Sequence, residues 1–400
     1  MHDIVIVGGG LAGLRIALNL KTRYPERSIL ILEKYKVLGG RALTYKENGI
    51  QYEIGAGRIF HTHERMNKLV KRYGLTKYPI GTQTNYNDEP NDFLNLFQPL
   101  VKQLETLPST VLRTKTIEDI LGPNFAPILR MYPYRAEMDL LRADLALPLF
   151  RTSETMGASG DNEYYGIKEG YTTLVDKLAK EVRKAGVTIQ VETHVDDVKQ
   201  RSTTLFEITG KHKETPFGME AKQVIVATCR CSLSDFSVLK GKPLLNQLQT
   251  SPLCRIYAIF PKENGKVWFK GLPKTVTTNP LRYIIPIHEE SGLIMISYTD
   301  GLDTEHWRHL KGEELEKAIL QAANEQFPGM HIPKPTFLKK HFWPSGCTYW
   351  AKGNYDVIQA QKAAMNPLPN LYVVGESVAI HQEWMESALE TADMVAESFE

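Results

Sequence analysis

The stretch from Ile4 to Gly13, IVIVGGGLAG, decides the fold of this chain. Its first four residues are all β-branched, which predicts a short strand buried on both faces. Gly8, Gly10 and Gly13 then form a G-x-G-x-x-G turn, and the apolar residues of 14–20 predict a helix that begins in that turn. Gly8 permits the tight turn, Gly10 lets the backbone approach a pyrophosphate, and Gly13 lets the helix pack on the strand.

The residues after this helix complete a dinucleotide-binding pattern. A second buried strand is expected over residues 28–32, and it ends at Glu33. A carboxylate at this place accepts hydrogen bonds from ribose hydroxyls and disfavours a 2′-phosphate, so NADP is not expected. A pyrophosphate would lie against the helix N-terminus, where N–H groups and the helix dipole favour negative charge. The alternative is a glycine-rich turn that holds no ligand.

Composition excludes several classes of protein. The chain has 400 residues, 42% hydrophobic and 24% charged, with a net charge of +2. These values are ordinary for a globular protein of two or three domains and leave no electrostatic footprint for nucleic acid or an anionic membrane. The sequence has no apolar run of eighteen residues and no visible secretory signal. The four cysteines are expected to be small buried thiols. We therefore expect a cytoplasmic protein without a membrane span or a metal site.

The rest of the chain suggests interleaved domains. Helices are expected over 93–107 and 136–145, inside a mostly helical insertion, and an amphipathic helix is expected over 171–184. A buried strand is expected over 371–374 and a terminal helix over 384–399. This order of strand, turn and helix is the same as in the first residues of the chain. The chain thus leaves the dinucleotide domain and returns to it.

Several further motifs carry a resemblance to a known family. They are Gly39-Gly40-Arg41, the turn from Gly55 to Arg58, Gly170-Tyr171, His194-Val195, Gly375-Glu376, and the segment from Gln382 to Leu389. Together with the first turn they resemble the flavin-containing amine oxidase superfamily, which includes L-amino acid, monoamine and polyamine oxidases. The closing motif of that family is Gly-Glu, then Gly-Trp-x-Glu-Gly-Ala. Here Glu383 and Ser387 replace its two glycines.

The resemblance implies an α/β fold and FAD as the cofactor. The expected architecture is a Rossmann-like FAD-binding domain of the GR2 type, interleaved with a mixed-sheet plus helical substrate domain. The FAD-binding domain is expected to comprise residues 1–75, 165–235 and 340–400, and the substrate domain residues 76–164 and 236–339. The residues implied to bind the cofactor are Gly8, Gly10, Leu11, Ala12, Gly13, Glu33, Lys34, Gly40, Arg41, Gly55, Ala56, Gly57, Arg58, Val195, Glu376, Trp384 and Met385.

Arg58 is the most informative residue for the substrate. In the L-amino acid oxidase branch, a Gly-x-x-Arg turn places an arginine that holds the substrate carboxylate, and a planar guanidinium suits that task. His63 falls where that branch also has a histidine. Arg58 could instead contact the flavin or pair with an internal acid. Ile284 and Ile285 stand near positions where the branch has tyrosines, which weakens the amino acid interpretation.

The expected catalytic residues are Arg255 and Trp384. Arg255 stands where the family has a lysine that orients water at the flavin, and arginine keeps the charge but cannot act as a base. The alternative is an ordinary strand arginine. Trp384, with Tyr349 and Trp350, is expected to line the substrate pocket, as is Trp343; core packing is the alternative for each. Cys347 faintly resembles the cysteine that binds flavin covalently in monoamine oxidases.

These features predict an FAD-dependent oxidase of amines or L-amino acids. Hydride would pass from the substrate α-carbon to flavin N5, giving an imine, then an oxo product, ammonia and H2O2. The expected partners are a small amine or amino acid and O2 or another electron acceptor, with neither nucleic acid nor membrane; a homodimer is left open. Two alternatives stay open: an enzyme resembling UDP-galactopyranose mutase, and a flavin-binding scaffold with little turnover.

Overall fold

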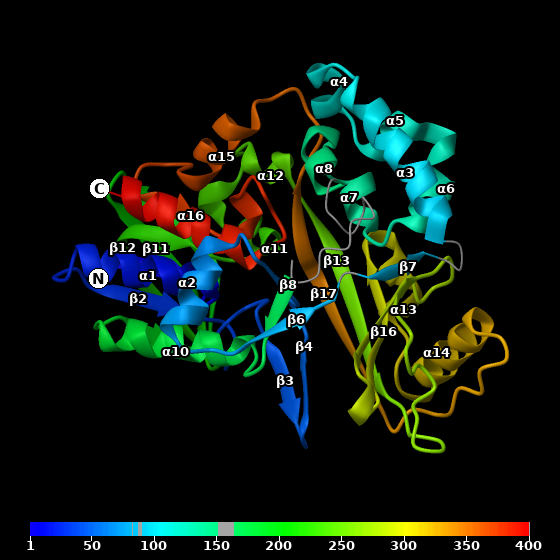
Figure 1. Cartoon of the computed structure of the whole chain (residues 1–400). Helices are drawn as coiled ribbons and strands as arrows, with labels where there is room; N and C mark the ends of the chain where they lie inside the picture. The colour runs from blue at the N-terminus through cyan, green and yellow to red at the C-terminus, as the bar shows by residue number, and fades with distance from the viewer. Residues whose placement is uncertain (82, 87–89, 151–163, 400) are drawn as a thin grey trace.

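Two large sheets, built from interleaved parts of the chain, organise the computed structural model (Figure 1). The residues described are 1–81, 83–86, 90–150 and 164–399. The first sheet has the order β10-β11-β12-β1-β2-β9, and β18 also pairs with β12. Its strands are β1 (His2–Val7), β2 (Ile29–Leu32), β9 (Thr188–Gln190), β10 (Thr193–Ser202), β11 (Leu205–His212), β12 (Thr215–Val226) and β18 (Leu371–Val373).

The parallel part of the first sheet contains the strands that the sequence predicted. β1 runs parallel to β2 and β12, and β12 runs parallel to β18. Ile4, Val5 and Ile6 are fully buried, as expected for a strand covered on both faces. The sheet thus combines segments from the beginning, middle and end of the chain, and the expected Rossmann-like α/β class is confirmed.

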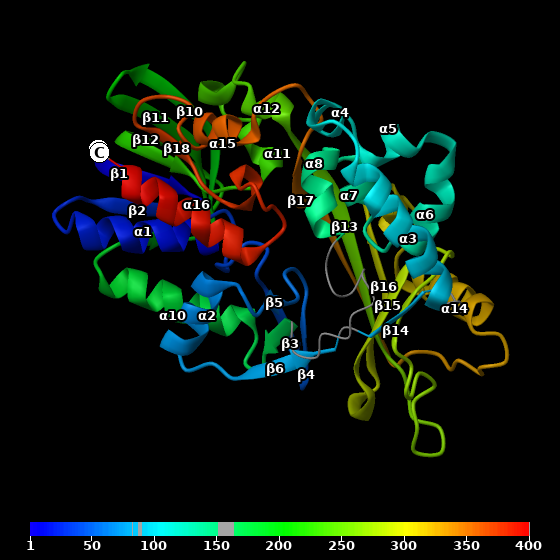
Figure 2. The ribbon, with the colours of Figure 1, turned by 45° about the horizontal axis from the view of Figure 1, so that its top comes forward.

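Helices from the beginning, middle and end of the chain cover the first sheet. They are α1 (Leu11–Arg23), α2 (Glu64–Arg72), α10 (Tyr171–Lys184) and α16 (Met385–Ser398). α1 lies beside α16, and the Arg15 guanidinium bonds to Asp393 at 2.6 Å (Figure 2). Glu386, in the first turn of α16, accepts backbone N–H groups of Arg65 and Met66 in α2. The C-terminal helix is therefore fixed beside the glycine turn that begins α1.

The second sheet has the order β17-β13-β16-β15-β14-β7, antiparallel except for β14 and β7. Its strands are β7 (Thr84–Tyr86), β13 (Leu248–Ile259), β14 (Lys274–Val276), β15 (Tyr283–His288), β16 (Leu293–Asp300) and β17 (Phe337–Trp350). α13 (Glu305–Arg308) and α14 (Gly312–Gln326) share an apolar core with this sheet, centred on the fully buried Trp307. Residue 340, an expected domain boundary, lies inside β17, and the division into domains stays a proposal.

A block of helices lies between β7 and β8 (Tyr164–Ile167) in the chain. It contains α3 (Pro90–Glu105), α4 (Ser109–Thr114), α5 (Ile117–Leu121), α6 (Phe125–Met131), α7 (Arg135–Asp139) and α8 (Ala143–Leu149). The expectation of one helix over 136–145 was wrong. Arg142 is extended, with φ −60° and ψ 140°, and its N–H donates to the Trp350 carbonyl at 3.1 Å. Its guanidinium pairs with Asp144 at 2.6 Å, so this tertiary contact interrupts the helix.

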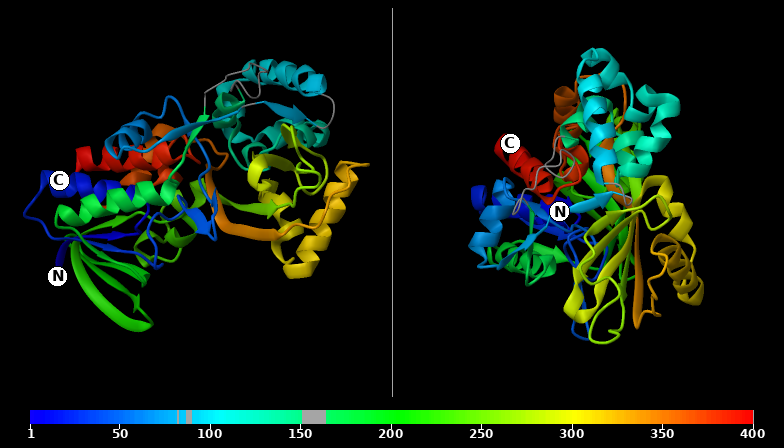
Figure 3. Two further views of the ribbon diagram at one scale, coloured as in Figure 1. Left: turned by 60° about the horizontal axis from the view of Figure 1, so that its bottom comes forward. Right: turned by 45° about the vertical axis from the view of Figure 1, so that its right-hand side comes forward.

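The remaining helices and strands lie around and between the two large sheets. Figure 3 shows the molecule from two other sides, with both termini beside the first sheet. The remaining elements are β3 (Thr44–Glu47), β4 (Ile50–Glu53), β5 (Ile59–Phe60), β6 (Lys77–Ile80), β8 (Tyr164–Ile167), α11 (Arg230–Leu233), α12 (Leu244–Gln247) and α15 (Val357–Met365). β3 pairs with β4, and β8 lies between β5 and β6. In the part of the chain that the structure describes, no helix is both long and apolar enough to cross a membrane.

Candidate active site

The glycines of the first turn are required for different physical reasons. Gly8 has φ +110°, and a Cβ there would lie 2.4 Å from the Ala227 carbonyl oxygen. A Cβ at Gly13 would lie 2.1 Å from the Gly8 carbonyl oxygen, because α1 packs directly on the turn. A Cβ at Gly10 would meet no protein atom closer than Gly39 O at 3.8 Å. Gly8 and Gly13 are therefore needed by the fold, whereas the space at Gly10 opens toward a cavity.

Glu33 closes the turn from the end of β2. Its carboxylate accepts the N–H of Gly9 at 2.7 Å and the N–H of Tyr35 at 2.9 Å. The side chain is buried, and this burial raises its pKa even though the N–H donors oppose the shift. Glu33 lines the cavity beside Lys34 and Val195, as expected for an acid that receives ribose hydroxyls.

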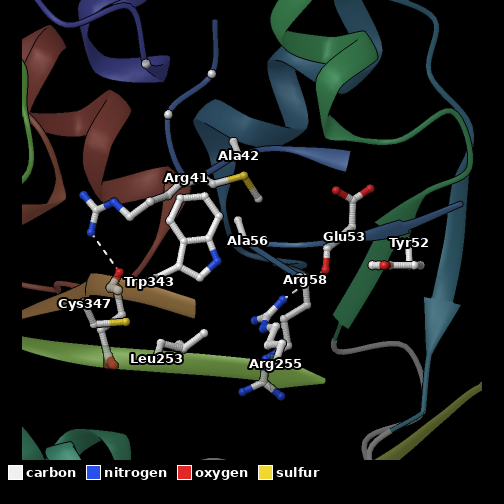
Figure 4. Close-up of a pocket in the computed structure, with 18 of the residues that line it drawn as sticks. Arg41, Ala42, Tyr52, Glu53, Ala56, Arg58, Leu253, Arg255, Trp343 and Cys347 are labelled. Carbon is white, nitrogen blue, oxygen red and sulfur yellow. Dashed lines mark hydrogen bonds between the residues drawn. The ribbon is translucent and has the colours of Figure 1, made fainter. Parts of the chain in front are cut away.

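Arg41 and Glu376 join the two ends of the chain. Arg41 Nη1 lies 2.5 Å from Glu376 Oε1 and also donates to the Gly346 carbonyl at 2.9 Å (Figure 4). Glu376 Oε1 accepts the Thr348 hydroxyl at 3.0 Å, and Oε2 accepts the backbone N–H of Glu383 at 3.2 Å. One buried carboxylate therefore holds the arginine loop, β17 and the C-terminal motif together.

A single cavity of about 1380 Å³ runs from the glycine turn to the second sheet. It is larger than ordinary ligand pockets of roughly 300–1,000 Å³, which suits a dinucleotide together with a substrate. Of the residues expected to bind cofactor, those that line it are Gly8, Gly10, Leu11, Ala12, Glu33, Lys34, Gly40, Arg41, Gly55, Ala56, Gly57, Arg58, Val195, Glu376, Trp384 and Met385. Gly13 lies behind this lining, between helix and strand.

The residues of the cavity fit FAD. The open space at Gly10 faces the N-terminus of α1, where the first N–H groups of a helix favour a pyrophosphate. The buried Glu33 carboxylate and the Arg41 guanidinium stand in the same lining. FAD also requires room for the flavin ring, and the cavity continues past Ala56 to Trp343 and β13.

Arg58 lies in an aromatic enclosure. Its guanidinium donates to the Tyr134 hydroxyl at 3.0 Å and lies 4.2 Å from the Tyr164 ring centre and 5.7 Å from the Trp384 ring centre. Glu137 lines the same cavity, and the positive charge of Arg58 acts to lower the pKa of that carboxyl. The structure thus places Arg58 at the cavity and already engaged with protein groups.

Two carboxylic acids face the same end of the cavity. Glu137, in α7, accepts the Tyr132 hydroxyl and is buried, which raises its pKa well above the ordinary value. Glu383 accepts the Tyr349 hydroxyl at 2.5 Å, and burial together with neighbouring acids raises its pKa to about 7. The sequence analysis did not identify either as a site residue.

Arg255 reaches the cavity from β13. Its Nη1 donates to the Glu53 carbonyl at 3.4 Å, and its guanidinium lies 5.2 Å from the Tyr298 ring centre (Figure 4). Nη1 is also 3.3 Å from the place of a Cβ at Gly57, so the arginine supports the turn that carries Arg58. A permanent cation therefore lines the cavity from β13, and its correspondence to the family's lysine stays a prediction.

The expected aromatic residues divide into two groups. Trp343 and Trp384 line the cavity, as does Cys347. Tyr349 and Trp350 do not belong to its lining; they are 1% and 0% exposed. The Trp350 indole donates to the Ala379 carbonyl at 2.7 Å, and the Tyr349 hydroxyl bonds to Glu383. These two residues hold the loop that precedes Trp384.

Trp384 is supported from behind. The His63 ring packs on it edge-on at 4.8 Å, and burial lowers the pKa of His63 to about 4, so this imidazole is neutral at pH 7. Ile285 lines the cavity, whereas Ile284 is buried in the core under the second sheet. Tyr283 and Tyr298 line the cavity instead, so tyrosines are present close to the positions where the sequence showed isoleucines.

Two family models match this chain, on either side of residues 74–132. One described as Flavin containing amine oxidoreductase matches residues 133–398, and one described as NAD(P)-binding Rossmann-like domain matches residues 6–73. The chain belongs to the flavin-containing amine oxidoreductase family. This membership makes it a flavoprotein of the FAD-dependent oxidoreductase class.

Similar proteins agree with this family. An uncharacterised protein of Acanthamoeba polyphaga mimivirus is 32% identical over 98% of this chain and 92% of its own length. Bovine (Bos taurus) amine oxidase A is 33% identical over 81 residues, which are 20% of this chain and only 15% of that enzyme. Putrescine oxidase bound to putrescine has a TM-score of 0.77 at 14% identity, covering 99% and 98% of the two chains. Cyclohexylamine oxidase from Brevibacterium oxydans has a TM-score of 0.76 at 16% identity, covering 99% of each chain.

Proposed function

We propose that this flavoprotein oxidises small amines. One observation supports the proposal most strongly: a continuous cavity is lined at one end by the dinucleotide turn and at the other by Trp384, Tyr298 and two carboxylic acids. A cofactor held by Gly10 and Glu33 would therefore reach the chamber where aromatic faces can bind a substrate. The similarity in fold to putrescine and cyclohexylamine oxidases is compatible with an amine substrate.

The chain's own residues would position cofactor and substrate. When bound, FAD supplies a two-electron acceptor that takes a hydride from the substrate α-carbon and passes the electrons to O2, giving H2O2, or to another acceptor. The amine would leave as an imine, which water converts to an oxo product and ammonia. Trp384 offers a flat face to the substrate, and its ring lies parallel to that of Tyr164 with centres 6.3 Å apart. Tyr283 and Tyr298 line the same cavity and offer further aromatic surface to a substrate.

An amine without an α-carboxylate fits the chamber better than an amino acid. Arg58, the expected carboxylate anchor, is held by Tyr134 and by aromatic faces. An α-carboxylate beside it would also approach Glu137 and Glu383, which line the same compartment. Repulsion from an ionised Glu383 would offset part of the attraction to Arg58. Oxidation of L-amino acids is the second candidate, favoured by the position of Arg58 in the cavity.

Matched pairs of substrates test the proposal. Tyramine and L-tyrosine differ only in the α-carboxylate, as do isopentylamine and L-leucine. Each would be mixed without oxygen with the FAD-loaded protein, and the absorbance of oxidised flavin would be followed. We expect the amine of each pair to bleach the flavin faster. Bleaching by the amino acids alone would identify the second candidate, and a flavin that all four leave oxidised refutes amine oxidation.

A further inference from the structure

Glu383 has a backbone conformation that glycine normally adopts. Its φ is +75°, in the left-handed region, at the position where the closing motif of the family has glycine. A side chain there is costly, and such costs persist mainly at functional sites. The residue directly precedes Trp384, so the strained position places a carboxylate beside the aromatic wall of the cavity.

Glu383 lies at the substrate end of the cavity. It lines both the main cavity and a small adjoining one of about 50 Å³ that also contains Arg58, Glu137 and Trp384. The Glu383 carboxylate accepts a hydrogen bond from the Tyr349 hydroxyl at 2.5 Å. The titratable groups that interact with Glu383 come from β17, η5 (Glu376–Val378), β16 and the helical block: Cys347, Tyr349, Glu376, Tyr298, Asp300, Tyr132 and Glu137. Arg58 lines the same small cavity.

The two acids of this compartment differ in protonation. Burial, then the negative charge of Glu383, raises the pKa of Glu137 well above its ordinary value, which favours the neutral form of that carboxyl. Burial raises the pKa of Glu383 only to about 7, because the bond from Tyr349 opposes the effect of burial. A carboxylate that changes charge near neutral pH is suited to accept a proton.

We propose that Glu383 is the catalytic base that removes a proton from the substrate ammonium. The inference rests on the proposed amine oxidation. One N–H bond of the ammonium breaks, and its proton forms an O–H bond with a Glu383 oxygen. The electron pair left on nitrogen then forms the C=N bond of the iminium as the α-hydrogen leaves with its own pair to the oxidised flavin. Arg58 is a permanent cation and burial favours the neutral form of Glu137, which leaves Glu383 as the acceptor in this compartment.

This role predicts a specific pH profile. With the base present, the rate constant for flavin reduction at low substrate concentration rises through pH 7 as Glu383 loses its proton. It levels off near the pKa of the amine, about 10 as for a lysine side chain, because a neutral amine needs no base. Without the base, only amine that is already neutral reacts, so the rate climbs steadily up to pH 10.

Glu383→Gln and Glu383→Gly test the proposal. E383G restores the glycine that φ +75° favours, so it is expected to fold and retain FAD even if E383Q does not. In both variants the rate constant for flavin reduction should no longer rise through pH 7. At pH 7 their reduction by tyramine should be slower by about 10²–10³-fold, a loss that shrinks to under about tenfold at pH 10. The proposal is overturned if the rise through pH 7 persists in the variants, or if their reduction rate is lowered by the same factor at every pH.

A second readout does not depend on turnover. In difference infrared spectra of the FAD-loaded protein, a carboxylic acid band that disappears between pH 6 and 8 should be absent in E383G. Tyr349→Phe removes the bond that opposes protonation, so this titration and the rise in the reduction rate should both move to higher pH. No band lost in E383G means that Glu383 is not the base. If the band titrates but no amine reduces the wild-type flavin, the proposed function itself fails.

Discussion

Gly10 and Gly13 stand three residues apart in one motif, yet they should respond oppositely to alanine. A Cβ at Gly13 would lie 2.1 Å from a backbone oxygen and 3.3 Å from Ala227 Cβ, and neither can move without shifting α1 or its turn. Overpacking costs about 1–3 kcal/mol where neighbours can relax, so we expect Gly13→Ala to cost about 2–4 kcal/mol. At roughly 2 °C per kcal/mol, the melting temperature of the FAD-free protein should fall by about 4–8 °C.

Gly10→Ala should instead leave the FAD-free protein almost unchanged. The nearest protein atom is 3.8 Å from the added Cβ, and φ at Gly10 is −78°, which alanine adopts readily. The loss of a glycine N-cap and the lower entropy of the unfolded chain nearly cancel, within about 1 kcal/mol. The methyl group would occupy space that the pyrophosphate needs, so FAD affinity should fall by about 10–100-fold, or about 1.4–2.8 kcal/mol.

Two measurements separate these effects. Thermal unfolding of the FAD-free variants reports the fold, and titration with FAD followed by flavin fluorescence reports affinity. Gly218→Ala is the control, because a Cβ there meets nothing within 4 Å and φ is not positive. If Gly10→Ala lowers the melting temperature as much as Gly13→Ala and leaves FAD affinity intact, the assignment of the turn is refuted.

Three other predictions concern charged residues. Arg41→Met leaves Glu376 buried without its cation and should lower the free energy of unfolding in urea by about 2–4 kcal/mol. Lys222→Met, which breaks the exposed pair with Asp3, should lower it by under about 1 kcal/mol. Equal losses of stability in the two variants would contradict this prediction. Arg255→Lys restores the residue that the family resemblance implies and should speed reoxidation of reduced flavin by O2 in stopped flow; an unchanged rate speaks against that role. Burial raises the pKa of Asp300 to about 7, from about 3.9 in the unfolded chain. Between these two pH values the folded state binds one more proton than the unfolded state, so the free energy of unfolding falls as the pH rises. Asp300→Asn should reduce this dependence of stability on pH, and an unchanged dependence would disprove the prediction.

The cofactor end of the site could be predicted because its signals are local. The glycine turn needs no tertiary information, since Gly8 and Gly13 are constrained by atoms of the adjoining strand ends and of the turn itself. The contribution of the C-terminus followed from the motif around Glu376 and Trp384, and the Arg41–Glu376 ion pair shows how the two ends meet.

The substrate end could not be predicted in the same way. Glu137 lies on a five-residue helix with no motif, and only the packing of the helical block against the second sheet brings it to the cavity. Tyr349 and Trp350 were expected to line the pocket because they are aromatic, but their polar atoms bond to the loop before Trp384. Glu383 did carry a signal, namely a side chain where the motif has glycine, and the positive φ gives it a physical meaning.

Flavin reduction by an α-deuterated amine tests the central claim most directly. The FAD-loaded protein would be mixed without oxygen with tyramine or with tyramine carrying deuterium at the α-carbon, and the loss of flavin absorbance would be timed. The account predicts that tyramine bleaches the flavin and that deuterium slows the bleaching, because the α-carbon–hydrogen bond breaks in that step. A flavin that stays oxidised, or one that bleaches at the same rate with both substrates, would contradict it.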